Sequence, residues 1–125
     1  MAKVLVYPVG QAPHTQEVDG LEDMQKIVGG YIEYVDLGAL SQIPELEGYD
    51  LYCNEEGKLI GLPLNVIFPA DHMMGDFFIS KANEEGETIS LTKEDIEKIV
   101  YQMEYNSNLV SAHDITKIKF NSNLK

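Results

Sequence analysis

Short apolar runs separated by turn-forming residues constrain the fold of this chain more than any other feature of its sequence. Val4–Val6, Leu51–Cys53 and Phe77–Ile79 are long enough for a buried strand and too short for a buried helix. No run approaches the roughly 18 apolar residues that would span a membrane. A chain assembled from such pieces is expected to form a sheet of short strands, without a membrane-spanning segment.

This pattern predicts seven strands. They are Lys3–Tyr7, His14–Val18, Tyr31–Val35, Tyr49–Cys53, Lys58–Ile60, Asp76–Ser80 and Asp114–Phe120. Asn54–Gly57 is the expected turn of a hairpin whose return limb is Lys58–Ile60, with Gly57 at a positive φ. The segment Leu64–Ala70 fits a strand or a loop equally well, and Asp36–Gly48 is expected to be irregular.

Two segments carry apolar residues at helical spacing. They are Leu21–Val28, with Leu21, Met24, Ile27 and Val28, and a segment from Lys93 to about Tyr105, with Ile96, Ile99, Val100 and Met103. Gly29 and Gly30 are expected to end the first helix, because glycine adopts left-handed conformations at little cost. Thr92 is the expected N-cap of the second helix, with Asp95 at the capping-box position.

Runs of strands with two segregated helices indicate an α+β fold, mainly an antiparallel sheet with two helices in a single domain. A chain of 125 residues is too short for two cores of ordinary size. Residues 1–105 are expected to form the main body, and residues 106–125 a strand or extension of the same domain. Two helices are too few to cover both faces of a large sheet. We therefore expect a homo-oligomer, a dimer or larger, whose interface buries some of the seven tyrosines.

The charge distribution excludes most nucleic-acid binding. The net charge is −12, and all nine basic residues are lysines. Residues 1–92 hold sixteen acidic residues against four lysines, whereas residues 93–125 are balanced. Since nucleic-acid binding depends on cationic contacts to phosphates, direct binding is not expected. The acidic surface then either keeps the protein soluble or imitates a polyanion to occupy a DNA-binding protein.

No residue pattern for metal binding or cofactor binding is present. His14, His72 and His113 are scattered, and the single Cys53 stands alone. A structural or catalytic zinc site needs ligands at close spacing, so no metal is expected. Gly29-Gly30 precedes a strand and not a helix, which is unlike a phosphate-binding loop, so no cofactor is expected either.

Catalytic residues are also not expected. Cys53 lies in an apolar run and is followed by Glu55 and Glu56, whose charge disfavours a thiolate. Glu55-Glu56 and Glu84-Glu85 are paired carboxylates beside glycine turns, where exposure to solvent is the ordinary outcome. An enzyme that acts on nucleotides through Glu55 or Glu56 is a third hypothesis behind the two binding functions described below.

Five residues are the candidates for ligand binding: Tyr31, Asn54, Glu56, Lys58 and Asn65. Asn54 suits a turn, because its side chain can bond to its own backbone. Lys58 pairs with Glu55 or Glu56, or else contacts an anionic ligand. Asn65 either belongs to a turn or forms hydrogen bonds with the base edge or the ribose hydroxyl of a ligand. Tyr31 stacks on a flat ring or packs in the core, as do Tyr34 and Tyr52.

Several of these residues occur in a characteristic order. The chain carries Gly29-Gly30-Tyr31-Ile32-Glu33, then Asn54-Glu55-Glu56-Gly57-Lys58-Leu59, then Gly61-Leu62-Pro63 with Asn65, and then Gly75-Asp76-Phe77-Phe78-Ile79. With these motifs it resembles the family called domain of unknown function 3846. The resemblance runs from about Lys3 to Ile99. In that family an arginine often follows the asparagine matched by Asn65, whereas this chain has Val66.

Members of this family are small proteins carried mostly by phages, prophages and mobile elements of bacteria, so the resemblance implies a genetic setting. Proteins of that setting often counter host defence, some by binding a nucleotide immune signal. We therefore expect a non-enzymatic accessory protein that sequesters a small nucleotide-like ligand. The alternative is an acidic interaction module or DNA mimic that blocks a host DNA-binding or defence protein. The apolar part of the N-terminus is too short for a signal peptide, so the cytoplasm of the bacterial host cell is the expected location.

Overall fold

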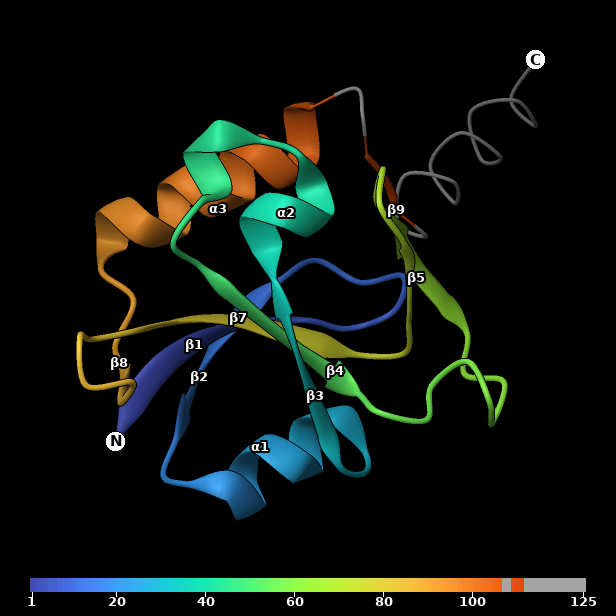
Figure 1. The fold of residues 1–125 in the computed structure, drawn as a ribbon, viewed down its shortest axis with the longest axis horizontal. Coiled ribbons are helices and arrows are strands. Elements are labelled where there is room, and N and C mark those ends of the chain that lie inside the picture. Colours follow the sequence, from blue (N-terminus) through green and yellow to red (C-terminus); the bar gives the residue numbers. More distant parts are fainter. Residues whose placement is uncertain (107–108, 112–125) are drawn as a thin grey trace.

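The computed structural model describes residues 1–106 and 109–111 (Figure 1). In chain order the elements are β1 (Ala2–Tyr7), β2 (His14–Val18), α1 (Leu21–Val28), β3 (Ile32–Asp36), α2 (Leu37–Ser41), the 3-10 turn η1 (Pro44–Leu46), β4 (Asp50–Asn54), β5 (Leu64–Ile67), β6 (His72–Met74), β7 (Phe77–Ala82), β8 (Thr88–Ile89), α3 (Lys93–Tyr105) and β9 (Val110–Ser111).

The main sheet has six strands. Five follow the order β2-β1-β7-β4-β3, and β8 pairs with the end of β7. Every pairing is antiparallel. The expected α+β fold with a mainly antiparallel sheet is therefore confirmed. The central strand β7 joins two hairpins, because β1 pairs with β2 on one side of it and β4 pairs with β3 on the other.

Helices lie on both faces of this sheet (Figure 1). On one face α1 packs through Val28 over a core that includes Phe78 of β7. On the other face α2, η1 and α3 cover a larger core that includes Phe77 and Ile79. The expectation that two helices would leave one face open is wrong: one face needs only α1, and the other is shared among α2, η1, α3 and a second, smaller sheet.

The smaller sheet has the order β6-β5-β9 and adjoins the larger core. Its middle strand β5 comes from the segment that the sequence assigned to neither strand nor loop. Val66 of β5 and Met73 of β6 are buried in the same core as α3. The sheet therefore extends the cover over the face that α2 and α3 protect. The predicted strand Asp114–Phe120 lies outside the described residues.

Both predicted helices are confirmed with their caps. Helix α1 spans Leu21–Val28 and ends at Gly29, whose φ of 76° is left-handed. Helix α3 spans Lys93–Tyr105 and begins with a complete capping box between Thr92 and Asp95. Their local signals were sufficient because caps and apolar spacing act within one or two turns of the helix.

Two predictions of secondary structure are wrong. Lys58–Ile60 forms no strand, because β4 already pairs with β3 and β7 on its two edges and leaves no site for a return limb. The segment Asp36–Gly48 is not irregular throughout, since it contains α2 and η1. Asp36 caps α2 by accepting a hydrogen bond from the Gly38 amide at 3.0 Å. The sequence did not predict this short helix, because Gly38 and Pro44 are typical of irregular segments.

A polar network at the start of α3 joins the helix to the main sheet. Asp95 accepts hydrogen bonds from the Tyr49 hydroxyl at 2.6 Å, from Lys81 Nζ at 2.6 Å and from the Thr92 amide at 2.7 Å. Only 14% of the Asp95 side chain is exposed. Burial alone would raise the pKa of Asp95, but the hydrogen bonds from Lys81, Thr92 and Tyr49 outweigh it and hold the pKa well below its usual range.

We predict that Asp95→Asn lowers the free energy of unfolding at pH 7 by about 2 kcal/mol, since it removes charge-assisted hydrogen bonds from a mostly buried site. The pKa of Asp95 is lower in the folded protein than in the unfolded chain. Its stabilisation is therefore complete above the unfolded value of about 4 and is lost as the pH falls through the folded value. The difference between wild type and variant, measured by urea unfolding, should shrink as the pH falls below about 4.

Glu97→Gln is the matched control on the same helix, because Glu97 makes an exposed ion pair with Lys93 at 3.9 Å. It should change stability by less than about 0.5 kcal/mol. Equal effects of the two substitutions would contradict the role of the Asp95 network.

Candidate functional site

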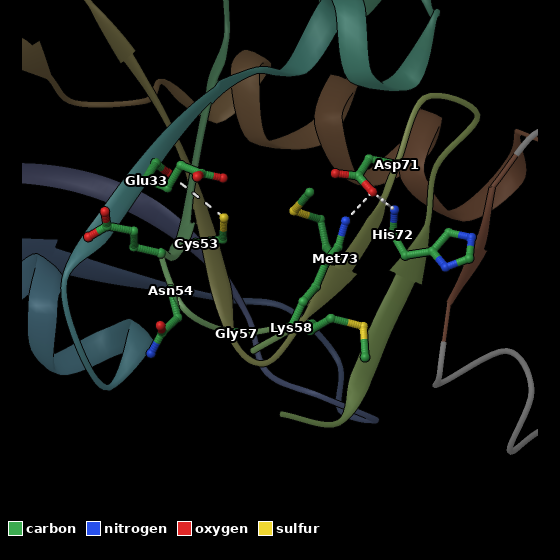
Figure 2. A pocket seen from close by; sticks show the side chains of 10 residues that line it. Glu33, Cys53, Asn54, Gly57, Lys58, Asp71, His72 and Met73 are labelled. Atoms are coloured by element: carbon green, nitrogen blue, oxygen red, sulfur yellow. Dashed lines mark hydrogen bonds and ion pairs between the residues drawn. The ribbon is translucent and has the colours of Figure 1, made fainter. Parts of the chain in front are cut away.

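A pocket of about 240 Å³ opens between the main sheet and the smaller sheet (Figure 2). Its lining is drawn from the β3–β4 hairpin, from the loop after β4, and from β6 with the residue before it. The lining residues are Glu33, Cys53, Asn54, Glu55, Gly57, Lys58, Asp71, His72, Met73 and Met74. The lining mixes charged and polar side chains with the sulfur-containing side chains of Cys53, Met73 and Met74.

Asn54 holds the loop after β4 in shape. Its side-chain oxygen accepts a hydrogen bond from the Glu56 amide at 2.8 Å, which closes a turn. Its side-chain nitrogen donates to the Val28 carbonyl at 3.1 Å, at the end of α1. Asn54 is buried, and its amide is committed to the backbone on both sides. It shapes the pocket wall and connects that wall to α1.

Gly57 is required by a close approach and not by its dihedral angles. The expected positive φ is wrong, because Gly57 is absent from the glycines with left-handed backbone. A Cβ atom at this position would lie 3.1 Å from the Met74 carbonyl oxygen. The loop therefore packs directly on β6, which brings Lys58 beside Asp71 and closes one side of the pocket.

Lys58 forms an ion pair with Asp71 across the mouth of the pocket (Figure 2). This corrects the expected pairing with Glu55 or Glu56. Asp71 also accepts the His72 amide at 2.8 Å. The hydrogen bond from Lys58, with the His72 amide, lowers the pKa of Asp71. Both side chains stay about half exposed, at 60% and 49%, so the pair is open to solvent and to exchange of partners.

Carboxylates dominate the electrostatics of the pocket. Glu33, Glu55 and Asp71 face a single lysine. Burial raises the pKa of the Cys53 thiol to about 11, and the nearby charges of Glu33 and Asp71 add to this effect. The thiol therefore stays protonated at neutral pH and acts as a small apolar group. The pocket presents many hydrogen-bond acceptors and few donors.

The structure brings two of the five candidate residues into the pocket, Asn54 and Lys58. Tyr31 lies beside it on the surface with 70% of its side chain exposed, and its carbonyl oxygen accepts the Glu55 amide at 2.9 Å. Glu56 is exposed on the loop and is not among the lining residues. Asn65 is buried away from the pocket, in β5.

Among the described residues, no group of three or more histidine, cysteine, aspartate and glutamate side chains has a geometry that could hold a metal ion. Within the same residues, no helix is long and apolar enough to cross a membrane.

Residues 1–105 match the model of the family described as Domain of unknown function (DUF3846). The chain belongs to the DUF3846 family. Comparison with curated proteins and with solved structures finds no match for it. The matched residues include the whole main sheet, α1 and α3. The description of the family names no activity.

The DUF3846 motifs that gave the resemblance serve the fold around the pocket. Asn65 donates to the Tyr7 carbonyl at 2.8 Å and to the Gly75 carbonyl at 2.9 Å. It therefore joins β1 and the β6–β7 turn to the smaller sheet. Val66, the next residue, is buried in the core.

Eight of the ten lining residues were not among the five candidates, and five of these eight lie on β3, on β6 or just before β6: Glu33, Asp71, His72, Met73 and Met74. No local signal selected them, because they lie far from Lys58 along the chain or belong to other strands. The only available signal was the pairing of Tyr31–Val35 with Tyr49–Cys53, which would have placed Glu33 opposite Cys53. The contact of the loop with β6 had no counterpart in the sequence.

We predict that Asn65→Ala lowers the free energy of unfolding by about 2 kcal/mol, because it leaves two buried carbonyl groups without their donor. Asn65→Asp should be at least as damaging, since it places a carboxylate against two carbonyl oxygens. Chemical denaturation followed by circular dichroism measures both variants.

Asn83→Ala is the matched control, because Asn83 accepts its hydrogen bonds from the Glu85 and Glu87 amides in an exposed turn. It should cost less than about 1 kcal/mol. A neutral effect of Asn65→Ala would contradict the role of Asn65 as a connection between the two sheets.

Proposed function

We propose that this DUF3846 member is a non-enzymatic binding protein that holds a small nucleotide-like ligand in the pocket between its two sheets. The observation that carries the proposal is the lining, which combines three carboxylates, one exchangeable lysine and two methionines. In the setting of a phage or mobile element, the protein would act in the bacterial cytoplasm and keep such a ligand from a host defence system.

The size of the pocket limits the ligand. Pockets for drug-sized molecules measure roughly 300–1,000 Å³, and this one measures about 240 Å³. It suits one ring system with its sugar better than a dinucleotide. The thioethers of Met73 and Met74 supply a polarisable surface for a flat ring.

The charges of the lining favour a ligand rich in hydrogen-bond donors. The carboxylates of Glu33 and Glu55 are acceptors only, and they match ribose hydroxyls or an exocyclic amine. Carboxylates that bind ribose hydroxyls occur in dinucleotide-binding sites for the same reason. The ligand is therefore expected to direct its sugar or its base amine toward the β3–β4 side of the pocket.

A single phosphate can be accommodated by Lys58. Its ion pair with Asp71 is exposed, and such pairs contribute roughly 0–1 kcal/mol. Lys58 can therefore leave Asp71 for a ligand phosphate at small cost. Several phosphates would meet Glu33, Glu55 and Asp71 with no further cation in the lining, so a nucleoside or a cyclic mononucleotide fits better than a triphosphate.

The chemistry of the lining argues for holding and against turnover. The Cys53 thiol is kept protonated, and its Sγ atom lies 3.9 Å from the Glu33 carbonyl oxygen in a weak hydrogen bond. His72 lies next to Asp71, but in Figure 2 its ring points away from the Glu33 side of the pocket. A nucleophile with an adjacent base is therefore not assembled among the lining residues.

The acidic interaction module stays a second candidate, because one observation favours it. Residues 31–57 contain seven acidic residues and no basic one, and they include the edge strand β3 and its partner β4. A homo-oligomer remains a further proposal, in which a second copy would enlarge the small pocket.

We expect isothermal titration calorimetry with nucleosides, cyclic mononucleotides and cyclic ADP-ribose to give heat for at least one nucleoside or cyclic mononucleotide. Glu33→Gln should weaken this binding by about tenfold or more, because a hydrogen bond to a charged group contributes about 1.5–3 kcal/mol. Lys58→Met should weaken only ligands that carry a phosphate. Ligand recovered after heat denaturation of the protein should be chemically unchanged.

Glu87→Gln is the control, because Glu87 lies in the turn between β7 and β8, outside the pocket lining. It should leave the affinity unchanged. Absence of heat for every compound, or a product formed during incubation, would reject the proposed function.

A further inference from the structure

The outer edge of β3 is an open edge of the main sheet. Strand β3 stands last in the order β2-β1-β7-β4-β3, with β4 as its neighbour (Figure 1). Within residues 1–106 and 109–111, no other strand pairs with it. An unpaired edge offers backbone donors and acceptors to a further strand.

The register shows which backbone groups point outward. The Tyr31 carbonyl accepts the Glu55 amide at 2.9 Å, and the Leu37 amide donates to the Tyr49 carbonyl at 3.1 Å. In an antiparallel ladder the residues alternate between bonding one neighbour and the other. The odd-numbered residues of β3 therefore bond to β4, and Ile32 and Tyr34 direct their N–H and C=O groups away from the sheet.

This edge is protected by negative charge alone, which does not oppose the addition of a basic strand. Proteins block exposed edges with charged side chains (lysine above all), proline, bulges or very short strands, and of these β3 has only the acidic Glu33 and Asp36. Strand β3 contains no lysine or proline, and its five pairs with β4 run without a register shift. The side chains of Tyr31 and Tyr34 are 70% and 56% exposed. The edge is thus regular, accessible and flanked by aromatic rings.

Negative charge surrounds the edge on both faces. Glu33 lies on one face of β3, and Asp36 is paired with Asp50 of β4 on the other. Burial raises the pKa of Asp50, a hydrogen bond from Tyr34 offsets part of this effect, and the charge of Asp36 adds to it. Like charges directly opposite one another destabilise a sheet, and an added cation would relieve this repulsion. No basic residue occurs between 31 and 57 to supply that cation from the hairpin itself.

These charges decide between the two strands that could be added. A second copy would bring the same acidic strand, so pairing of β3 with β3 places like charges together. An extended segment rich in lysine or arginine brings complementary charge. Its cations can also lie over the exposed ring of Tyr34, which already packs against Tyr52 with ring centroids 5.8 Å apart.

We propose that the edge of β3 binds a basic, extended segment of a partner protein, which adds a seventh strand to the main sheet. Backbone hydrogen bonds to Ile32 and Tyr34 supply affinity, and alternate cationic side chains, which share one face of the added strand, meet the pair Asp36–Asp50 on the face that carries Tyr34. This inference rests on the second candidate function, a protein partner, and is independent of the pocket ligand.

The test uses a fluorescent eight-residue peptide that alternates lysine with valine. Binding is measured by the fluorescence anisotropy of the peptide. Amide hydrogen exchange of the isotope-labelled protein is measured by NMR. At saturation the Ile32 and Tyr34 amides should exchange about tenfold more slowly or better, because new hydrogen bonds protect them. The Glu33 and Val35 amides already face β4 and should change little. Raising the salt concentration should weaken binding.

Two matched peptides separate strand pairing from simple charge attraction. Methylating the alternate amides that face β3 keeps the charge and removes the donors, so affinity should fall by tenfold or more. A glutamate-valine peptide should not bind. The assignment of the binding site to β3 is overturned if the methylated peptide binds equally well, or if binding leaves the exchange of the Ile32 and Tyr34 amides unchanged. Either result still supports an acidic surface that binds basic partners. Absence of any binding counts against both, and concentration-dependent protection without peptide would show β3 self-pairing instead.

Discussion

Burial of the central strand β7 on both of its faces is the constraint on which the rest of the structure depends. Phe77 and Ile79 are fully buried under α2 and α3, and Phe78 is fully buried under α1. Because successive side chains point to opposite faces, one three-residue apolar run requires cover on both sides of the sheet. Each fully buried side chain of this kind contributes about 1.5–3 kcal/mol. The helices lie where they cover these side chains, and the pairs β1–β2 and β3–β4 flank β7 on its two sides.

The pocket exists because the second sheet closes only part of the space beside β4. Met73 is buried in the larger core, while Asp71 and His72 stay at the surface. The loop after β4 lies against β6 through Gly57 and is held at its start by Asn54. Asn54 and Gly57 thus maintain the walls of the pocket, whereas its acidic character comes from side chains on strands and loops that meet only in the folded protein.

The pocket and the β3 edge use the same hairpin in different ways. Glu33 faces the pocket on one face of β3, and Tyr34 lies on the opposite face with Tyr52 and Phe78. The period of two along the strand separates the two surfaces, although the residues are neighbours in sequence. A small ligand and a basic protein segment could therefore occupy the protein through separate contacts, each compatible with its strong negative charge.

Features that depend on a few neighbouring residues could be predicted from the sequence. It specified α1 and α3 with their caps, the strands β1, β2, β3, β4 and β7, the α+β class and the family, because apolar periodicity and capping are local. The tertiary structure alone decided the partner of Lys58, the inner position of Asn65 and the absence of a strand at Lys58–Ile60. These depend on which strands occupy the edges of β4 and on how β6 packs against the loop. Such contacts join residues far apart in the chain, and no local pattern encodes them.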